Sequence, residues 1–140
     1  MREILFRGKR TDNGEWVEGF YIVIGNPFTK DGLPMRHCIA VDKTCFYYEV
    51  DPATVGQFTG LCDKNGNKIF EGDIVTRYKE NFLVIFDDAI YSACFGLFGK
   101  DRYGERTFFS FDFSEPSIAL AVIGNIHDNP ELMEAENNEK

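Results

Sequence analysis

Carboxylates and amides gather in a central stretch of the sequence, where residue types suited to proton transfer or cation binding stand close together. Asp63 and Asn65 lie in a turn-forming run, and Glu71 and Asp73 flank Gly72 a few residues further on. A pair of carboxylates can exchange protons, and carboxylate and amide oxygens bind hard cations. These four residues are therefore candidate binding positions. In the structural alternative, Gly72 supplies an unusual backbone angle and Asp73 accepts backbone N–H bonds.

The run Asp63–Asn67 does not follow the calcium-loop pattern. An EF-hand loop has Gly at its sixth position and a bidentate Glu at its twelfth. With Asp63 as the first position, Lys68 and Ile74 stand there instead. The sequence therefore predicts a hairpin turn at this run, and neither a metal nor a cofactor is expected.

Two further pairs of residues are suited to acid–base chemistry. His127 and Asp128 would offer a base and an orienting acid, but no serine or cysteine lies in a nucleophile elbow such as G-x-S-x-G. Asp87 and Asp88 follow an apolar run and favour a turn. No catalytic residue is predicted. An enzyme would need two or more members of one set to converge in a cleft: Glu71, Asp73, Asp87, Asp88 and His127.

The first ten residues are locally basic. Four cations, Arg2, Arg7, Lys9 and Arg10, stand there against one Glu, with Phe6 among them. Stacking of bases on an aromatic side chain of a basic strand is one way to bind single-stranded nucleic acid, so these four are candidate contacts. The whole chain has 15 Lys and Arg against 23 Asp and Glu, a net charge of −8, which disfavours a general nucleic-acid binder.

Apolar runs and turn residues alternate along the chain in the manner of an antiparallel, mainly β protein. Aromatic residues make up 15% of the chain, and Phe109, Phe111 and Phe113 alternate onto one side of a predicted strand. Asn-Gly pairs at 13–14 and 65–66 predict hairpin turns. The predicted strands are 4–10, 15–24, 37–42, 45–50, 55–59, 69–70, 74–78, 82–86, 89–98, 107–113 and 118–123.

Residues 1–130 are predicted to form one all-β domain, with an N-terminal β-hairpin subdomain at 1–59 and a second portion at 60–130. The pair Asp51-Pro52 is predicted to break the chain between two strands. Asn129-Pro130 predicts at most a short C-terminal helical turn. The last ten residues hold four Glu and one Lys, and an acidic, frayed tail is expected at 131–140.

The cysteines indicate the compartment. Cys38, Cys45, Cys62 and Cys94 form no C-x-x-C pair, and the chain begins without an apolar signal region. Apolar runs are also shorter than the roughly 20 residues of a membrane span. We expect free thiols in a reducing cytoplasm.

Three segments together resemble the YopX-like family of small phage and prophage proteins of Gram-positive bacteria. They are the opening Met1–Gly8, the central Gln57–Val75 and the closing Val122–Leu132, in the family's order and spanning the chain. Cys62 departs from the more polar or basic residue expected there in many relatives. The resemblance implies an SH3-like small barrel in the second half, phage or prophage origin in a bacterial host, and oligomerisation as an expectation. It implies no activity.

These observations favour a non-enzymatic β module that acts through contacts with a partner protein or with itself. The alternatives are a nucleic-acid-associated protein and an acidic inhibitor of a host nucleic-acid enzyme, whose carboxylates mimic phosphates. An enzyme ranks last, because no motif of the sequence specifies a reaction.

Overall fold

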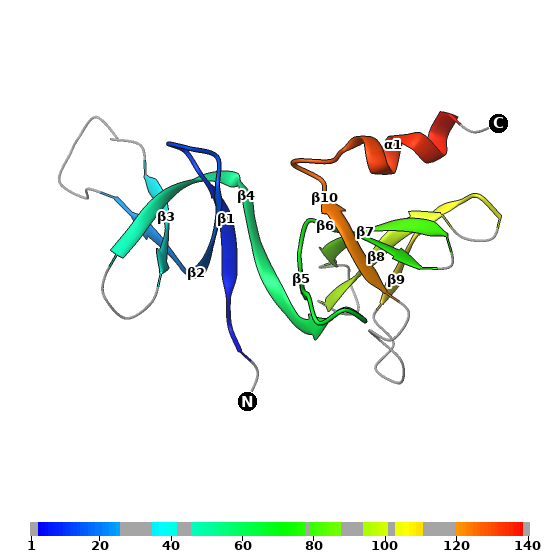
Figure 1. Cartoon of the computed structure of the whole chain (residues 1–140), viewed down its shortest axis with the longest axis horizontal. Helices are drawn as coiled ribbons and strands as arrows, with labels where there is room; N and C mark the ends of the chain where they lie inside the picture. Colours follow the sequence, from blue (N-terminus) through cyan, green and yellow to red (C-terminus); the bar gives the residue numbers. More distant parts are fainter. Residues whose placement is uncertain are drawn as a thin grey trace. The chain divides into compact units, whose positions relative to one another are not determined.

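The computed structural model describes residues 3–25, 35–41, 46–77, 79–87, 94–100, 103–110 and 120–138. Within these ranges the chain forms ten strands and one helix (Figure 1). They are β1 (Phe6–Arg10), β2 (Trp16–Ile24), β3 (Arg36–Val41), β4 (Phe46–Cys62), β5 (Lys68–Phe70), β6 (Asp73–Arg77), β7 (Glu80–Asp87), β8 (Cys94–Lys100), β9 (Arg106–Ser110), β10 (Ala121–Asn125) and α1 (Glu131–Asn138). All pairings described are antiparallel, so the predicted fold class is confirmed.

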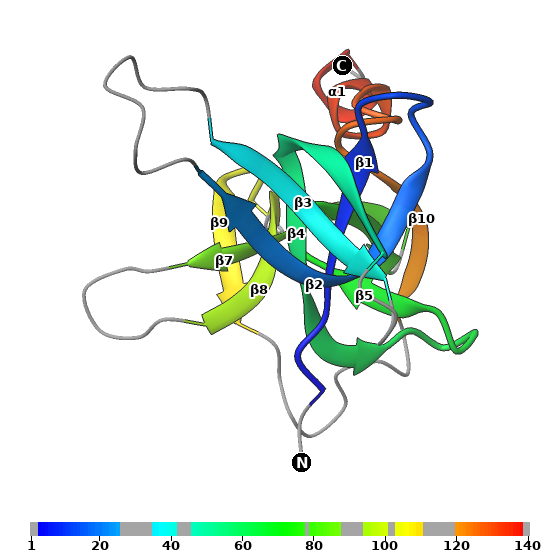
Figure 2. The ribbon, with the colours of Figure 1, turned by 90° about the vertical axis from the view of Figure 1, so that its left-hand side faces the viewer.

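The chain divides into two compact units, Met1–Phe58 and Thr59–Lys140. In the first unit, the strand pairings form a closed ring. β1 pairs with β2, β2 with β3 and β3 with β4, and β4 returns to pair with β1. Figure 2 shows β3 between β2 and β4. Because the ring closes, β1 has a hydrogen-bonded neighbour on each side.

β4 is a single strand of 17 residues, so the predicted break at Asp51-Pro52 is wrong. The strand changes partner there, from β3 at residues 46–49 to β1 from residue 50 onward. Asp51 accepts the Ala53 N–H through Oδ1 (3.0 Å) and the Thr54 hydroxyl through its carbonyl (2.6 Å). These local bonds bend the strand, and Pro52 is tolerated at a bend because it has no N–H to pair. The turn signals therefore mark a corner in a continuous strand.

The second unit contains a five-stranded sheet in the order β10-β6-β7-β8-β9. One face of this sheet contributes Val75, Phe82, Val84 and Leu97 to the hydrophobic core. Ile69 of β5 and Leu120, which directly precedes β10, complete the core. Parts of six predicted strands, at 42, 45, 78, 89–93, 111–113 and 118–119, lie outside the described residues. The SH3-like barrel stays a prediction.

The C-terminal segment is a helix of eight residues, where at most one helical turn and a frayed tail were predicted. Pro130 directly precedes it, and the Pro130 carbonyl accepts the Met133 N–H (3.1 Å). Asn81 of β7 donates Nδ2–H to the carbonyl of Leu132 (2.9 Å). So short a helix is marginal in isolation, and this contact with the sheet supplies support that local sequence patterns do not show.

Candidate functional site

Asp63 organises the turn at residues 63–67. It is 6% exposed, and its Oδ1 accepts the N–H groups of Asn65 (2.9 Å) and Asn67 (2.8 Å). Its Oδ2 accepts the N–H of Val122 on β10 (2.9 Å) and Nδ2–H of Asn67 (3.3 Å). Burial by itself would raise the pKa of Asp63, but the hydrogen bonds from Val122, Asn67 and Asn65 outweigh it and lower the pKa. The carboxylate thus holds β10 against the turn.

Asp73 has a comparable place at the start of β6. It is 1% exposed and accepts the Phe70 N–H through Oδ2 (2.8 Å). Gly72 has a φ of 93°, donates its N–H to Val84 (2.8 Å) and accepts the Ile126 N–H (2.9 Å). The contacts that the structure describes for the Asp63 and Asp73 side chains are thus within their own unit, and all but the Asn67 side-chain bond are with backbone N–H groups. Glu71 is half-buried beside them and Asn65 is exposed. A binding role for these four residues stays a prediction.

The structure places His127 and Asp128 in a turn at residues 125–129. Asn125 Oδ1 accepts the N–H groups of both residues (3.0 and 2.9 Å), and the His127 side chain is exposed. Asp87 ends β7 opposite Cys94, and Asp88 lies outside the described residues. Among the residues described, no group of three His, Cys, Asp or Glu side chains is placed to hold a metal ion.

Arg7 and Lys9 share a side of β1 and meet the same aromatic ring. The Trp16 ring centroid lies 4.7 Å from Arg7 Cζ and 6.0 Å from Lys9 Nζ. The strand register puts Glu18 opposite Arg7, and Asp51 opposite Lys9. Each of the two cations thus has an acidic residue across from it on a neighbouring strand.

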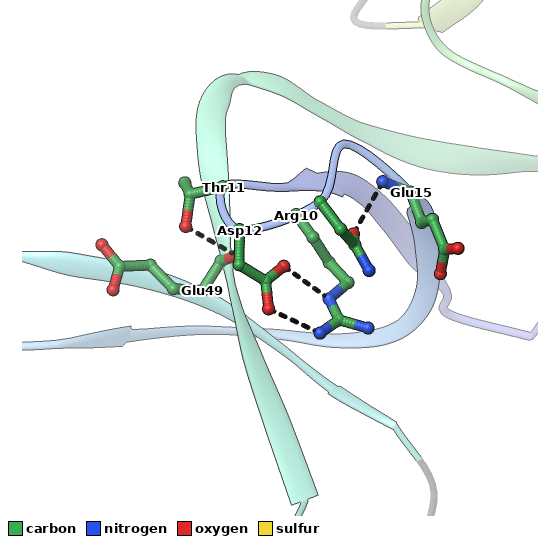
Figure 3. Close-up of polar contacts among 6 residues, drawn as sticks. Arg10, Thr11, Asp12, Glu15 and Glu49 are labelled. Atoms are coloured by element: carbon green, nitrogen blue, oxygen red, sulfur yellow. Dashed lines mark hydrogen bonds and ion pairs between the residues drawn. The ribbon is translucent and has the colours of Figure 1, made fainter.

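Arg10 is held at the first hairpin turn (Figure 3). Its Nε and Nη2 donate to the two carboxylate oxygens of Asp12 at 2.9 and 2.6 Å, and its Cζ lies 4.0 Å from the Tyr48 ring centroid. The hydrogen bonds raise the pKa of Arg10 and lower that of Asp12. The guanidinium therefore clamps the turn onto β4. Arg2, the fourth candidate nucleic-acid contact, lies outside the described residues.

A cavity of about 480 Å³ opens beside this clamp, between the hairpin turn, the start of β3 and the middle of β4. Its wall carries two cations, Lys9 and Arg10, and two carboxylates, Glu49 and Asp51. Glu49 also forms an ion pair with Arg36 (3.2 Å). The charges of the wall cancel, so the cavity favours neither an anion nor a cation.

Aromatic side chains also lie on the surface of the first unit. Phe20 is 60% exposed and Tyr47 is 46% exposed, and the register places both beside Ala40, one on each flanking strand. We call Phe20, Ala40 and Tyr47 the aromatic row. Sequence reasoning assigned the aromatic surplus mainly to the core. The row could not be predicted, because β2 has apolar residues at consecutive positions. Without a regular alternation of apolar and polar residues, the sequence does not show which side chains of β2 face the core.

The two units, a closed ring of strands and a five-stranded antiparallel sheet, define an all-β protein with a single short helix among its described residues. The sequence model of the YopX protein family matches residues 5–134, and the chain belongs to this family. Cys38, Cys62 and Cys94 are free thiols. In the described ranges, no helix has the length and apolarity needed to cross a membrane.

Comparison with curated proteins finds no match. Among solved structures, the chain is similar to the crystal structure of protein EF1440 from Enterococcus faecalis, with 24% sequence identity and a TM-score of 0.44. The match covers 95% of this chain and 99% of the other.

Proposed function

We propose that this YopX family protein is a non-enzymatic module that acts through protein–protein contacts, encoded by a phage or prophage and located in the cytoplasm of its bacterial host. The aromatic row carries the proposal. Apolar groups gathered on the surface of a folded protein mark interaction sites, and aromatic residues dominate the binding energy of such sites. The origin and location rest on the family resemblance and on the sequence.

The geometry of the aromatic row suits a protein surface. The small Ala40 side chain stands between two larger rings in register, so a partner side chain fits over it with aromatic contacts on both sides. The Tyr47 hydroxyl adds a hydrogen-bonding group to an apolar surface. Three adjacent strands hold these residues, so little backbone ordering is lost on binding.

The buried carboxylates support a non-enzymatic role. Asp63 and Asp73, the two least exposed acidic side chains among those described, are engaged by backbone N–H groups. His127 is exposed in a turn at the other end of β10 from Asp63's partner Val122. A carboxylate already bonded to structural donors is poorly suited to accept a proton from a substrate.

Affinity capture from the bacterial host tests the proposal, with nuclease-treated samples and mass spectrometry. We expect the wild-type protein to retain a specific protein partner or additional copies of itself. The double variant Phe20→Ser/Tyr47→Ser should weaken that association by on the order of tenfold or more, because it removes two aromatic contacts. Light scattering separates self-association from capture of another protein.

Tyr103→Ser is the matched control, since Tyr103 is 79% exposed but lies in the second unit. It should leave the association unchanged. Capture of nothing by the wild-type chain, combined with a monomeric state, contradicts the proposal. Equal loss of binding in both variants would also contradict it.

The charge distribution favours a second candidate, an acidic inhibitor of a host nucleic-acid enzyme. The first unit has seven Lys and Arg against eight Asp and Glu, a net −1, and the second has eight against fifteen, a net −7. Clustered carboxylates can mimic the phosphates of a nucleic acid. This function predicts that the captured partner is a nucleic-acid enzyme, and that free DNA competes for it.

A further inference from the structure

The sheet of the second unit has apolar side chains on both faces. Val75, Val84 and Leu97 belong to the core face. On the opposite face, the register aligns four apolar residues in a line across β6, β7, β8 and β9. This line, which we call the second-face row, consists of Ile74, Leu83, Phe98 and Phe108. Residues directly opposite each other on neighbouring strands share a face and touch.

Helix α1 lies beside the second-face row, over the next residues along the strands on the same face. Asn81 precedes Leu83 by two positions and therefore shares its face, and its Nδ2 bonds to the carbonyl of Leu132 in α1 (2.9 Å). Met133 of α1 lines a small cavity together with Phe98 of the row. Figure 1 draws α1 in red at the end of the chain, alongside the strands of this unit.

The cover that α1 provides is partial. Ile74 of the row is fully buried, whereas Leu83, Phe98 and Phe108 stay half-buried, as do Leu132 and Met133 of the helix. A space of about 40 Å³ lies between Met133 and the strands, and side chains around such a space lose contacts that a close fit would give. With eight residues, α1 is also too short to be stable when it leaves the sheet.

Helix α1 and the neighbouring ends of β8 and β9 have charged side chains of opposite sign. The first turn of α1 holds Glu131 and Glu134, and its last turn has no basic residue. Lys100 and Arg106 stand directly opposite each other on β8 and β9, and both line the cavity below Met133. An acidic helix therefore lies beside two basic residues of the sheet. This surface favours a ligand with negative charge.

We propose that the second-face row, with Lys100 and Arg106 beside it on β8 and β9, is a docking groove for an acidic amphipathic helix of a partner protein. In the free protein α1 occupies the groove, and a partner helix binds by displacing it. α1 itself shows which occupant the groove accepts: a short helix with adjacent apolar residues and an acidic first turn. The inference does not depend on the aromatic row of the first unit.

A peptide-binding experiment on the full chain tests the groove. The probe is a fluorescent peptide with the sequence of residues 129–140, and the protein is compared with its variant Leu132→Glu/Met133→Glu, in which α1 is released. A tethered helix competes at a high effective concentration, so we expect the released variant to bind the peptide about tenfold tighter than the wild type or better. A scrambled peptide should not bind.

The double substitution Lys100→Glu/Arg106→Glu, added to the released variant, should weaken binding severalfold and remove its dependence on salt. Equal affinity of wild type and released variant overturns the proposal, as does the lack of any peptide-induced shift in NMR spectra of a folded released variant. Dimerisation of the released variant in place of peptide binding assigns the groove to a second copy and also overturns it.

Hydrogen exchange gives a second measurement that needs no variant. If α1 detaches from the groove, its amides in the wild-type protein should exchange at least about tenfold faster than those of β7 and β8. Protection of α1 equal to that of these strands contradicts a displaceable helix.

Discussion

Single buried carboxylates connect distant parts of the second unit. Asp63 accepts two N–H groups from its own turn and one from Val122, which is 59 residues away in the chain. Loss of this acceptor leaves buried donors unpaired, and that costs more than a hydrogen bond contributes when both partners are present. Asp63 is therefore a stability determinant, whatever else it binds.

We expect Asp63→Asn to lower the free energy of unfolding by about 2 kcal/mol at pH 7, because an amide NH₂ then faces the donors that the carboxylate accepted. The folded-state pKa of Asp63 lies below its ordinary 3.8, so the stabilisation is fully present above about pH 4 and is lost as the pH falls through the lowered pKa. Urea titrations at pH 7 and in acid should show the deficit shrinking with acidification.

Asn65→Ala is the control for this experiment, because only the backbone of the exposed Asn65 bonds to Asp63. It should change the stability by less than about 0.5 kcal/mol. A deficit of Asp63→Asn that stays constant with pH would show that the charge of the carboxylate does not matter.

Gly96 on β8 allows two strands to pack closely. A Cβ atom at this position would lie 2.4 Å from Phe108 Cζ and 2.5 Å from the carbonyl oxygen of Phe109. Gly96→Ala should therefore destabilise the protein by about 1–3 kcal/mol, measured by thermal or urea unfolding. Gly25→Ala is the control, since its Cβ would meet nothing closer than Met35 Cγ at 3.5 Å. Similar stability of the two variants would contradict the close packing.

Among the strands, β4 pairs with two different neighbours along its length, first with β3 and then with β1. Thr54 stands at its bend and is 6% exposed. The Thr54 hydroxyl donates to the Asp51 carbonyl (2.6 Å) and accepts the Lys9 N–H of β1 (2.9 Å). Between Arg7 and Lys9 the register of β1 against β4 shifts, so the hydroxyl replaces a backbone acceptor at this irregularity.

Thr54→Val keeps the shape of the side chain but removes both hydrogen bonds of the hydroxyl. We expect a loss of about 1–3 kcal/mol, because the Lys9 N–H is left without this acceptor. Thr54→Ser retains the hydroxyl and should recover most of the loss. Denaturant titration of the three proteins measures this, and a serine variant as unstable as the valine variant would show that packing matters more than the bonds.

For the molecule as a whole, the net charge disfavours general nucleic-acid binding. The unit that contains the basic N-terminal strand has a net charge of −1, and the other has −7. Arg10 is paired with Asp12, and carboxylates stand opposite Arg7 and Lys9. A net negative charge on both units weakens the attraction to a phosphate backbone.

We expect no gel shift with a single-stranded oligonucleotide, even at about 50 mM salt. The variant Glu18→Lys/Asp51→Lys should bind it, because Arg7 and Lys9 then lose the carboxylates opposite them and two cations are added. Its binding should weaken steeply with added salt. A salt-sensitive shift with the wild-type protein would contradict the expectation and revive the nucleic-acid hypothesis.

Most of the strands, the two Asn-Gly turns and the family could be predicted from the amino-acid sequence alone. Apolar alternation and Asn-Gly pairs are local patterns, and the hydrogen-bonding and steric preferences that they reflect act over a few residues. Gly14 and Gly66 do have positive φ angles, of 74° and 86°. The family match over residues 5–134 agrees with the three segments that suggested it.

How those elements pair and pack became visible only in the folded chain. The fold kept β4 continuous through Asp51-Pro52, because bonding to β3 and then to β1 outweighs a local break signal. It made a helix of a predicted tail, because the Leu132 carbonyl finds a donor on β7. Folding also leaves the Phe20 side chain exposed and buries Asp63. These outcomes depend on partners far away in the chain, whose positions no local pattern contains.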